Sequence, residues 1–300
     1  MTQRNATVMP FFSIRPYVSL FLGALVGWTL IGSIRVYKHG WSSADSFKAA
    51  CRRPRILCYI NTFPAQYENK AIHAQNTWAR RCDKFWFTST KLHPNLKVLK
   101  LNLTASETRM HLWSKMRAIL RRIYEEVESF DFFFKADDDT YTVFENLLNT
   151  LKSQSPDIPF MTGYRWPLRI EGGYFSGGAG YVLSREALKR IVEDSVDRHV
   201  DCPTNDENME DVKMSLCGHA VGVKRYDSFD EDGKSVFCPT TISEPYLNIN
   251  TTISEGDFEK MGHSYRQATF HYVTANKMYI LEFCHYYLRP QLLRFQRAIT

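Results

Sequence analysis

A buried strand pattern that ends in three consecutive carboxylates, within Phe132–Tyr141, constrains the fold of this chain most. Alternate side chains share a face in extended backbone, so Asp137 and Asp139 are expected to point the same way and Asp138 the other way. Two hard oxygen ligands at the carboxyl end of a strand suit Mg²⁺ or Mn²⁺, metals that also bind phosphate oxygens. The alternative interpretation is an Asx-turn or an N-cap cluster before a helix near Val143.

Strand and helix patterns alternate along the chain. Besides the run that ends in aspartates, strands are expected at residues 56–60, 85–87, 96–101 and 160–164, and helices at 68–80, 107–127, 143–151, 185–196, 207–216 and 274–288. This alternation predicts an α/β fold with a largely parallel sheet. Ligands of such sheets bind beyond the carboxyl ends of the strands, where the aspartates lie. Residues 226–265 are polar and are predicted to form a long irregular loop.

The amino-terminal region contains an uncharged apolar stretch at residues 16–34. It is long enough to cross a bilayer as a helix, and a buried core helix is the alternative. We therefore expect a short cytoplasmic tail at 1–15, a transmembrane signal anchor at 16–34, a stem at 35–54 and a single lumenal catalytic domain at 55–300. The net charge of +6 is mild and interspersed, which does not indicate a nucleic-acid-binding protein.

Cysteines and glycosylation sequons favour this orientation. The chain has seven cysteines, so at least one is unpaired or forms an intermolecular bond. Two pairs flank predicted helices without zinc-ligand spacing, and an oxidising compartment would favour disulfides between such residues: Cys58 with Cys82, and Cys202 with Cys217. The sequons at Asn102 and Asn250 both follow the apolar stretch.

Three further features admit a structural or a chemical interpretation. The glycine-rich run 172–180 does not fit a P-loop or dinucleotide pattern; it predicts either a bulged turn or a close approach of backbone to a sugar. Glu210 and Asp211 lie on a short amphipathic helix and could form a solvated face or contribute a catalytic carboxylate. His271, in a strand-like run, could be a hydrogen-bonded interior residue or a metal ligand.

Together these motifs resemble the core 1 β1,3-galactosyltransferases, a family that shares its fold with the wider β1,3-glycosyltransferases and fringe proteins. The likeness covers residues 55–225 and 268–290 in order, and the long motifs that carry it lie at 134–141, 173–190, 210–211, 270–273, 278–279 and 287–290. His73, Thr77–Ala79 and Arg81–Cys82 match as well.

The resemblance implies a GT-A (Rossmann-like) α/β domain in a type II Golgi membrane protein. Its activity would be an inverting, Mn²⁺-dependent transfer of galactose from UDP-galactose to the 3-hydroxyl of N-acetylgalactosamine (GalNAc) on Ser or Thr of glycoproteins. A homodimer is a possible assembly. The two cysteine pairs named above match disulfides of the family.

The resemblance also assigns residues by matching position. Asp137, Asp139 and His271 would bind the metal, and Asp211 would act as the catalytic base. The residues on the donor side would be Asn61, Glu107, Thr108, Arg109, Lys115 and Tyr272.

The chain departs from the family pattern at several positions. Thr108 and Ser215 replace glycines, and residues 240–267 lack the tryptophan- and tyrosine-rich segment and the adjacent cysteines that precede the histidine strand. Because aromatic faces would stack on the acceptor, this difference concerns the acceptor more than the donor. Two alternatives therefore stay open: a divergent, fringe-like enzyme that uses another UDP-sugar or acceptor, and a catalytically silent, chaperone-like paralogue. The presence of all the metal-binding and base positions together favours an active enzyme.

Overall fold

The computed structural model describes residues 52–241 and 264–291. The chain divides into two compact units, residues 1–52 and 53–300. The first unit lies almost entirely outside the described residues, and so does the transmembrane segment predicted at 16–34. Among the described helices, none is both long enough and apolar enough to span a bilayer.

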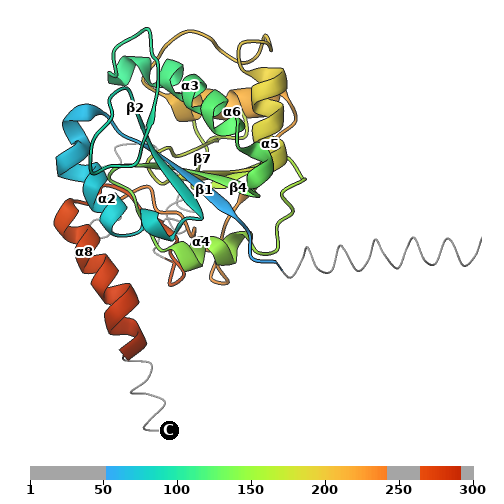
Figure 1. The fold of residues 1–300 in the computed structure, drawn as a ribbon. Helices are drawn as coiled ribbons and strands as arrows, with labels where there is room; N and C mark the ends of the chain where they lie inside the picture. Colours follow the sequence, from blue (N-terminus) through green and yellow to red (C-terminus); the bar gives the residue numbers. More distant parts are fainter. Residues whose placement is uncertain (1–51, 242–263, 292–300) are drawn as a thin grey trace, which may run out of the picture. The chain divides into compact units, whose positions relative to one another are not determined.

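A central seven-stranded sheet forms the core of the second unit (Figure 1). Its order is β10-β6-β9-β4-β1-β2-β3. All neighbouring pairs are parallel except those of β9, which runs antiparallel to both β4 and β6. The predicted α/β class with a largely parallel sheet is therefore confirmed. The strands are β1 (Ile56–Asn61), β2 (Lys84–Ser89), β3 (Val98–Lys100), β4 (Phe132–Asp137), β6 (Phe160–Gly163), β9 (Tyr181–Ser184) and β10 (Lys224–Asp227).

Helical layers bury both faces of the sheet. In β4, Phe133 packs into the core under α3, α5 and α6, whereas Phe132 and Phe134 pack into the opposite core with residues of α2 and α4. Figure 1 shows α3, α5 and α6 on one side of the sheet and α4 on the other, with α8 beside α2. The helices are α2 (Ile72–Asn76), α3 (Leu112–Tyr124), α4 (Phe144–Leu151), α5 (Arg185–Arg190), α6 (Glu210–Ala220) and α8 (Ala275–Phe283).

Several helical segments differ from the predicted bounds. The segment predicted as one helix at 68–80 contains a π turn at Tyr67–Ala71, the short α2 and a 3-10 turn at Ala79–Arg81. The helix predicted at 207–216 begins at Glu210 and continues to Ala220. The remaining 3-10 or π turns are Pro64–Gln66, Arg109–His111, Val127–Ser129, Ile191–Ser195 and Cys284–Leu288.

Of two small two-stranded ladders, only the strand-like run before His271 was expected from the sequence. β5 (Tyr141–Thr142) pairs with β11 (Thr269–Phe270), and β7 (Arg165–Trp166) pairs with β8 (Tyr174–Phe175), antiparallel in both cases. A two-residue strand is too short to show hydrophobic alternation. The first ladder brings a late segment of the chain against the carboxyl end of β4.

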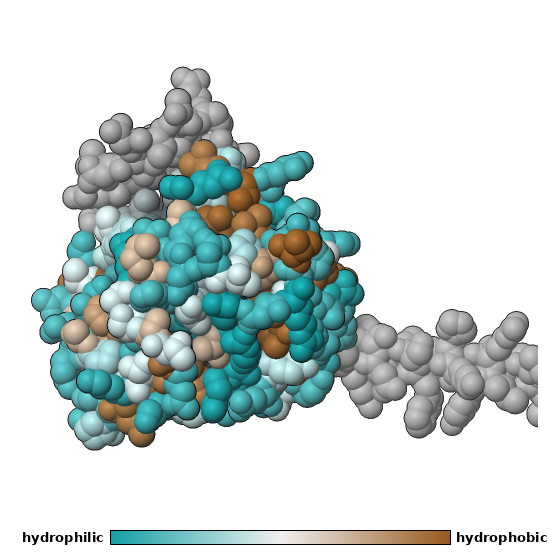
Figure 2. All heavy atoms as spheres, turned by 90° about the horizontal axis from the view of Figure 1, so that it is seen from above, coloured by the Kyte–Doolittle hydropathy of each residue, from teal (hydrophilic) through white to brown (hydrophobic). Residues whose placement is uncertain are grey.

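Both predicted disulfides are present, Cys58–Cys82 and Cys202–Cys217. In the chain-entropy account, loops of this length give each bond about 3 kcal/mol of stabilisation. On the side viewed in Figure 2, hydrophilic residues dominate the surface and apolar residues lie in small groups.

Candidate active site

Asp137, Asp139 and His271 converge at the carboxyl end of β4. One potential ligand atom from each residue lies within 4.8 Å of the other two. Asp137 ends the strand, and the Thr140 hydroxyl accepts a hydrogen bond from the Asp137 amide at 3.1 Å. The resulting tight turn directs Asp139 back toward the histidine, so the predicted shared side of the two aspartates matches the structure.

Contacts on both sides orient the His271 ring. Its Nδ1 lies 3.2 Å from the Pro239 carbonyl oxygen, and its Nε2 lies 3.4 Å from Asp139 Oδ1. If Nδ1–H donates to that carbonyl, the lone pair of Nε2 faces the aspartates, which is the arrangement of a metal-binding histidine. The ring also lies against Gly178, where an added Cβ would come within 1.9 Å of His271 Cε1.

Asp211 lies on the other side of the same glycine pair. One of its carboxylate oxygens accepts from the Gly177 amide at 3.0 Å and the other from the Val212 amide at 2.9 Å. An added Cβ on Gly177 would come within 2.8 Å of Glu210 Oε1. Because Gly177 and Gly178 have no side chains, two groups can approach the same backbone. One is the cluster of Asp137, Asp139 and His271, and the other is the acidic start of α6. The glycine-rich run therefore packs against side chains of the site itself.

A buried lysine joins the two groups. Lys135 Nζ lies 2.8 Å from Asp137 Oδ1, 3.1 Å from Glu210 Oε1 and 2.9 Å from the Gly177 carbonyl oxygen. Burial would lower the pKa of this lysine, but the carboxylates of Asp137 and Glu210 outweigh burial and raise it. Burial raises the pKa of Glu210 to about 7, with Lys135 opposing and Asp211 adding to the shift. Lys135 is thus a buried cation held by carboxylates from two elements.

Lys70 supplies a second cation. Its Nζ lies 2.8 Å from Asp139 Oδ2 and 3.8 Å from Asp138 Oδ1. Burial opposes ionisation of Asp139, yet the contacts of His271 and then Lys70 hold the pKa of Asp139 well below its usual range. Asp138 turns away and accepts from the Thr62 hydroxyl at 2.7 Å; burial raises its pKa to about 7.

Comparison with known proteins identifies the family. A sequence model of the fringe-like family matches residues 65–262. The glycoprotein-N-acetylgalactosamine 3-beta-galactosyltransferase 1 of Xenopus laevis is 32% identical over 252 residues, which cover 79% of this chain and 68% of that protein. The chain belongs to the core 1 β1,3-galactosyltransferase family, within the fringe-like group.

More distant likenesses extend beyond this core 1 family. Human chondroitin sulfate synthase 3 is 26% identical over 173 residues, and the match covers 51% of this chain but 20% of that protein. Among solved structures, the galactosyltransferase LgtC in complex with donor and acceptor sugar analogues matches with a TM-score of 0.41 and 10% identity, over 72% of this chain and 86% of that one. A likeness at this level says nothing about activity.

Some of the residues assigned to the donor side in this core 1 family member are buried, and others are exposed. Lys115 and Glu107 form a buried pair at 2.8 Å, and Lys115 also donates to the Thr62 carbonyl. Asn61 ends β1, and its buried Oδ1 has no hydrogen-bond partner among the described residues. Because Thr62 also binds Asp138, these contacts connect the Glu107 region to the triplet of aspartates.

The other assigned donor-side residues are exposed. Thr108 and Arg109 lie on the surface at the start of a 3-10 turn. Tyr272 is 61% exposed, has a φ of +52°, and stacks on the His271 ring with 3.7 Å between ring centroids. Thr108 and Arg109 follow Glu107 in the chain, but among the described residues no hydrogen bond or ion pair links these two or Tyr272 to the Glu107–Lys115 pair.

Sequence reasoning missed Lys70 and Lys135 and left Glu210 without a role. For Lys135 a signal existed, because a lone lysine inside an apolar strand requires a buried partner. Nothing in the sequence near Lys70 pointed to Asp139, since their contact depends on how the π turn packs against the end of β4.

Proposed function

We propose that this galactosyltransferase moves galactose from UDP-galactose to the 3-hydroxyl of GalNAc linked to Ser or Thr of glycoproteins. The observation that carries the proposal is the convergence of Asp137, Asp139 and His271 on one side of Gly177–Gly178, with Asp211 on the other. On this proposal, the metal and the diphosphate would bind on one side of this dipeptide and the base would act from the other. The similarity to the glycoprotein-N-acetylgalactosamine 3-beta-galactosyltransferase 1 of Xenopus laevis supports the choice of sugar and acceptor.

The donor set fits a divalent cation such as Mn²⁺. Two carboxylates and one imidazole suit this metal, and the Pro239 carbonyl oxygen orients the imidazole. The cation would be held by Asp137, Asp139 and His271. When bound, it neutralises negative charge on the departing diphosphate. Asn61, Glu107, Thr108, Arg109, Lys115 and Tyr272 are proposed to form the donor side, the buried pair Glu107–Lys115 acting by positioning.

Asp211 is proposed to act as the base. Its carboxylate would accept the proton of the acceptor hydroxyl as that oxygen attacks the anomeric carbon. The amides of Gly177 and Val212 fix the orientation of this carboxylate before the acceptor binds. Direct displacement with one base inverts the α-linked donor to a β-linked product, so the domain would work as an inverting enzyme of the GT-A type.

The two disulfides support a lumenal catalytic domain, because structural disulfides persist in oxidising compartments. We infer a Golgi type II membrane protein on this basis and on the apolar stretch at 16–34.

A donor screen tests the proposal directly. The full-length chain in detergent is given UDP-galactose, UDP-glucose, UDP-GlcNAc or UDP-GalNAc with a GalNAc-threonine glycopeptide, with Mn²⁺ or with EDTA. We expect transfer of galactose, seen as a mass increase of the glycopeptide, and its loss in EDTA. Transfer of another sugar would instead indicate the divergent enzyme, and a protein that neither transfers sugar nor binds UDP would indicate the silent paralogue.

Replacing Gly178 by alanine should weaken metal-dependent UDP binding at least about tenfold. The new Cβ would come within 1.9 Å of the His271 ring, so the imidazole must leave its position beside the aspartates. Calorimetric titration of UDP in the presence of Mn²⁺ measures the change. Gly218→Ala is the matched control, because its Cβ would come no closer than 3.3 Å to the flexible Met161 side chain. Equal UDP affinities for Gly178→Ala and wild type would remove His271 from the metal site.

A further inference from the structure

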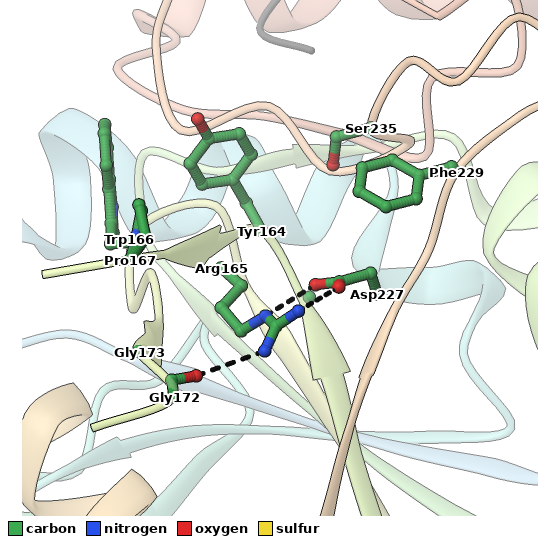
Figure 3. Close-up of a pocket in the computed structure, with 10 residues that line it drawn as sticks. Tyr164, Arg165, Trp166, Pro167, Gly172, Gly173, Asp227, Phe229 and Ser235 are labelled. Carbon is green, nitrogen blue, oxygen red and sulfur yellow. Dashed lines mark hydrogen bonds and ion pairs between the residues drawn. The ribbon is translucent and has the colours of Figure 1, made fainter. Parts of the chain in front are cut away.

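A pocket of about 260 Å³ lies between the β7–β8 hairpin and the segment from Asp227 to Ser235 (Figure 3). None of the residues that line it belongs to the cluster of Asp137, Asp139 and His271. Its volume is below the 300–1,000 Å³ typical of sites for drug-sized ligands. A single sugar ring fits such a space, whereas a nucleotide sugar does not.

Three aromatic side chains form much of the pocket wall. The rings of Tyr164 and Trp166 meet edge to face, with 4.9 Å between their centroids. Figure 3 shows these two rings on one side of the pocket and Phe229 on the other. Phe229 is 46% exposed, although its ring is apolar. Flat apolar walls of this kind suit the C–H face of a pyranose.

A charged pair supplies the polar part of the pocket. Arg165 Nε donates to Asp227 Oδ1 at 2.8 Å, Nη2 contacts the other carboxylate oxygen, and Nη1 donates to the Gly172 carbonyl at 3.2 Å. The two side chains remain about one-third and one-quarter exposed, so their pairing contributes little to stability. Their remaining donors and acceptors can bind sugar hydroxyl groups.

The pocket is connected to Asp211 through the β7–β8 ladder. Trp166 lies directly opposite Tyr174, and the Ser176 amide donates to the Tyr164 carbonyl at 2.8 Å. The next residue, Gly177, is the one whose amide binds Asp211. Burial, and then the nearby Asp211 carboxylate, raise the pKa of Tyr174, which agrees with this proximity.

We propose that this pocket is the acceptor-sugar subsite, in which the GalNAc ring stacks on Trp166 and is hydrogen-bonded by Arg165 and Asp227. The inference rests on the proposed function and names the residues that select its acceptor. Residues 240–267 contain no tryptophan. The β7–β8 hairpin would therefore supply the aromatic surface that the resemblance leads one to expect in that segment.

Two acceptors and two variants test the subsite in the full-length chain. Methyl α-GalNAc carries the sugar alone, and a GalNAc-threonine glycopeptide adds the peptide. For Trp166→Ala we expect kcat/KM for both acceptors to fall at least about tenfold, with UDP-galactose hydrolysis unchanged. Phe229→Ala should lower kcat/KM for both acceptors several-fold. Because Phe229 is partly exposed, this substitution is expected to affect the stability of the fold little. Phe283→Ala, an exposed aromatic on α8, is the control and should change neither.

Direct sugar binding separates failure of the subsite from failure of the proposed reaction. Saturation-transfer NMR should detect the ring protons of methyl α-GalNAc on the wild-type chain and lose that signal in Trp166→Ala and weaken it in Phe229→Ala, whether or not galactose is transferred. The inference is overturned if both variants bind the sugar like wild type, or if the loss of kcat/KM is confined to the glycopeptide, since the pocket would then bind peptide.

Discussion

Asp211→Asn is expected to lower the turnover of galactose transfer by about 10²–10⁴-fold while leaving the Kd for UDP within about twofold of wild type. Asparagine has the same size and can retain an oxygen for the Gly177 amide, although its NH2 group cannot accept from the Val212 amide. Its amide, however, cannot accept the proton of the acceptor hydroxyl. Initial rates at saturating donor and acceptor, together with calorimetric titration of UDP, measure the two quantities.

Asp201→Asn is the matched control for that experiment, because the Asp201 side chain is 74% exposed and lies outside the site. It should leave turnover unchanged. Near-normal turnover of Asp211→Asn would require a different base. A parallel loss of UDP affinity would instead place Asp211 on the donor side.

Lys135→Met is expected to lower the free energy of unfolding by about 3–5 kcal/mol. The substitution keeps the volume of the side chain in the buried strand but removes the cation that contacts Asp137, Glu210 and the Gly177 carbonyl. Two carboxylates would then remain without their buried counter-charge. Urea denaturation followed by circular dichroism measures the loss.

Two further variants separate a charge effect from a packing effect. Lys224→Met, at an exposed position of β10, should change the free energy of unfolding by less than about 1 kcal/mol. Lys135→Met combined with Glu210→Gln should recover part of the loss, because one of the two stranded charges is gone. Glu210→Gln alone completes the comparison. If the loss of unfolding free energy in the double variant equals the sum of the losses in the two single variants, Glu210 and Lys135 do not interact energetically.

The central parallel strands of the sheet could be predicted because they are buried on both faces, whereas the more exposed parallel edge strand β10 was not predicted. The central strands are short apolar runs, as at Ile56–Ile60, and their order along the chain indicates their connections. The antiparallel β9, the hairpin of β7 and β8, and the pairing of β5 with β11 were not predicted. Strand β9 (Tyr181–Ser184) follows the glycine-rich run directly, so the sequence gives no clear signal of where the strand begins.

Some residues of the candidate site could be predicted from the sequence alone, and others could not. The alternation of side chains in a strand predicted that Asp137 and Asp139 share a side, but in the structure a turn after the end of β4 brings them together. His271 was assigned to the metal only through resemblance, since a histidine in a short apolar run is more often a hydrogen-bonded interior residue. The partners of Lys70 and Lys135 depend on tertiary packing, and no spacing in the sequence encodes them.

The ladder between β5 and β11 has a consequence for biosynthesis. It brings His271 from near the end of the chain to aspartates that emerge from the ribosome much earlier. A nascent polypeptide can therefore assemble its sheet while still unable to capture an ion with all three ligands. A chain that ends before His271 would lack one of the three proposed ligands, and it would also lose Met278 and Glu282, which pack against the earlier part of the domain.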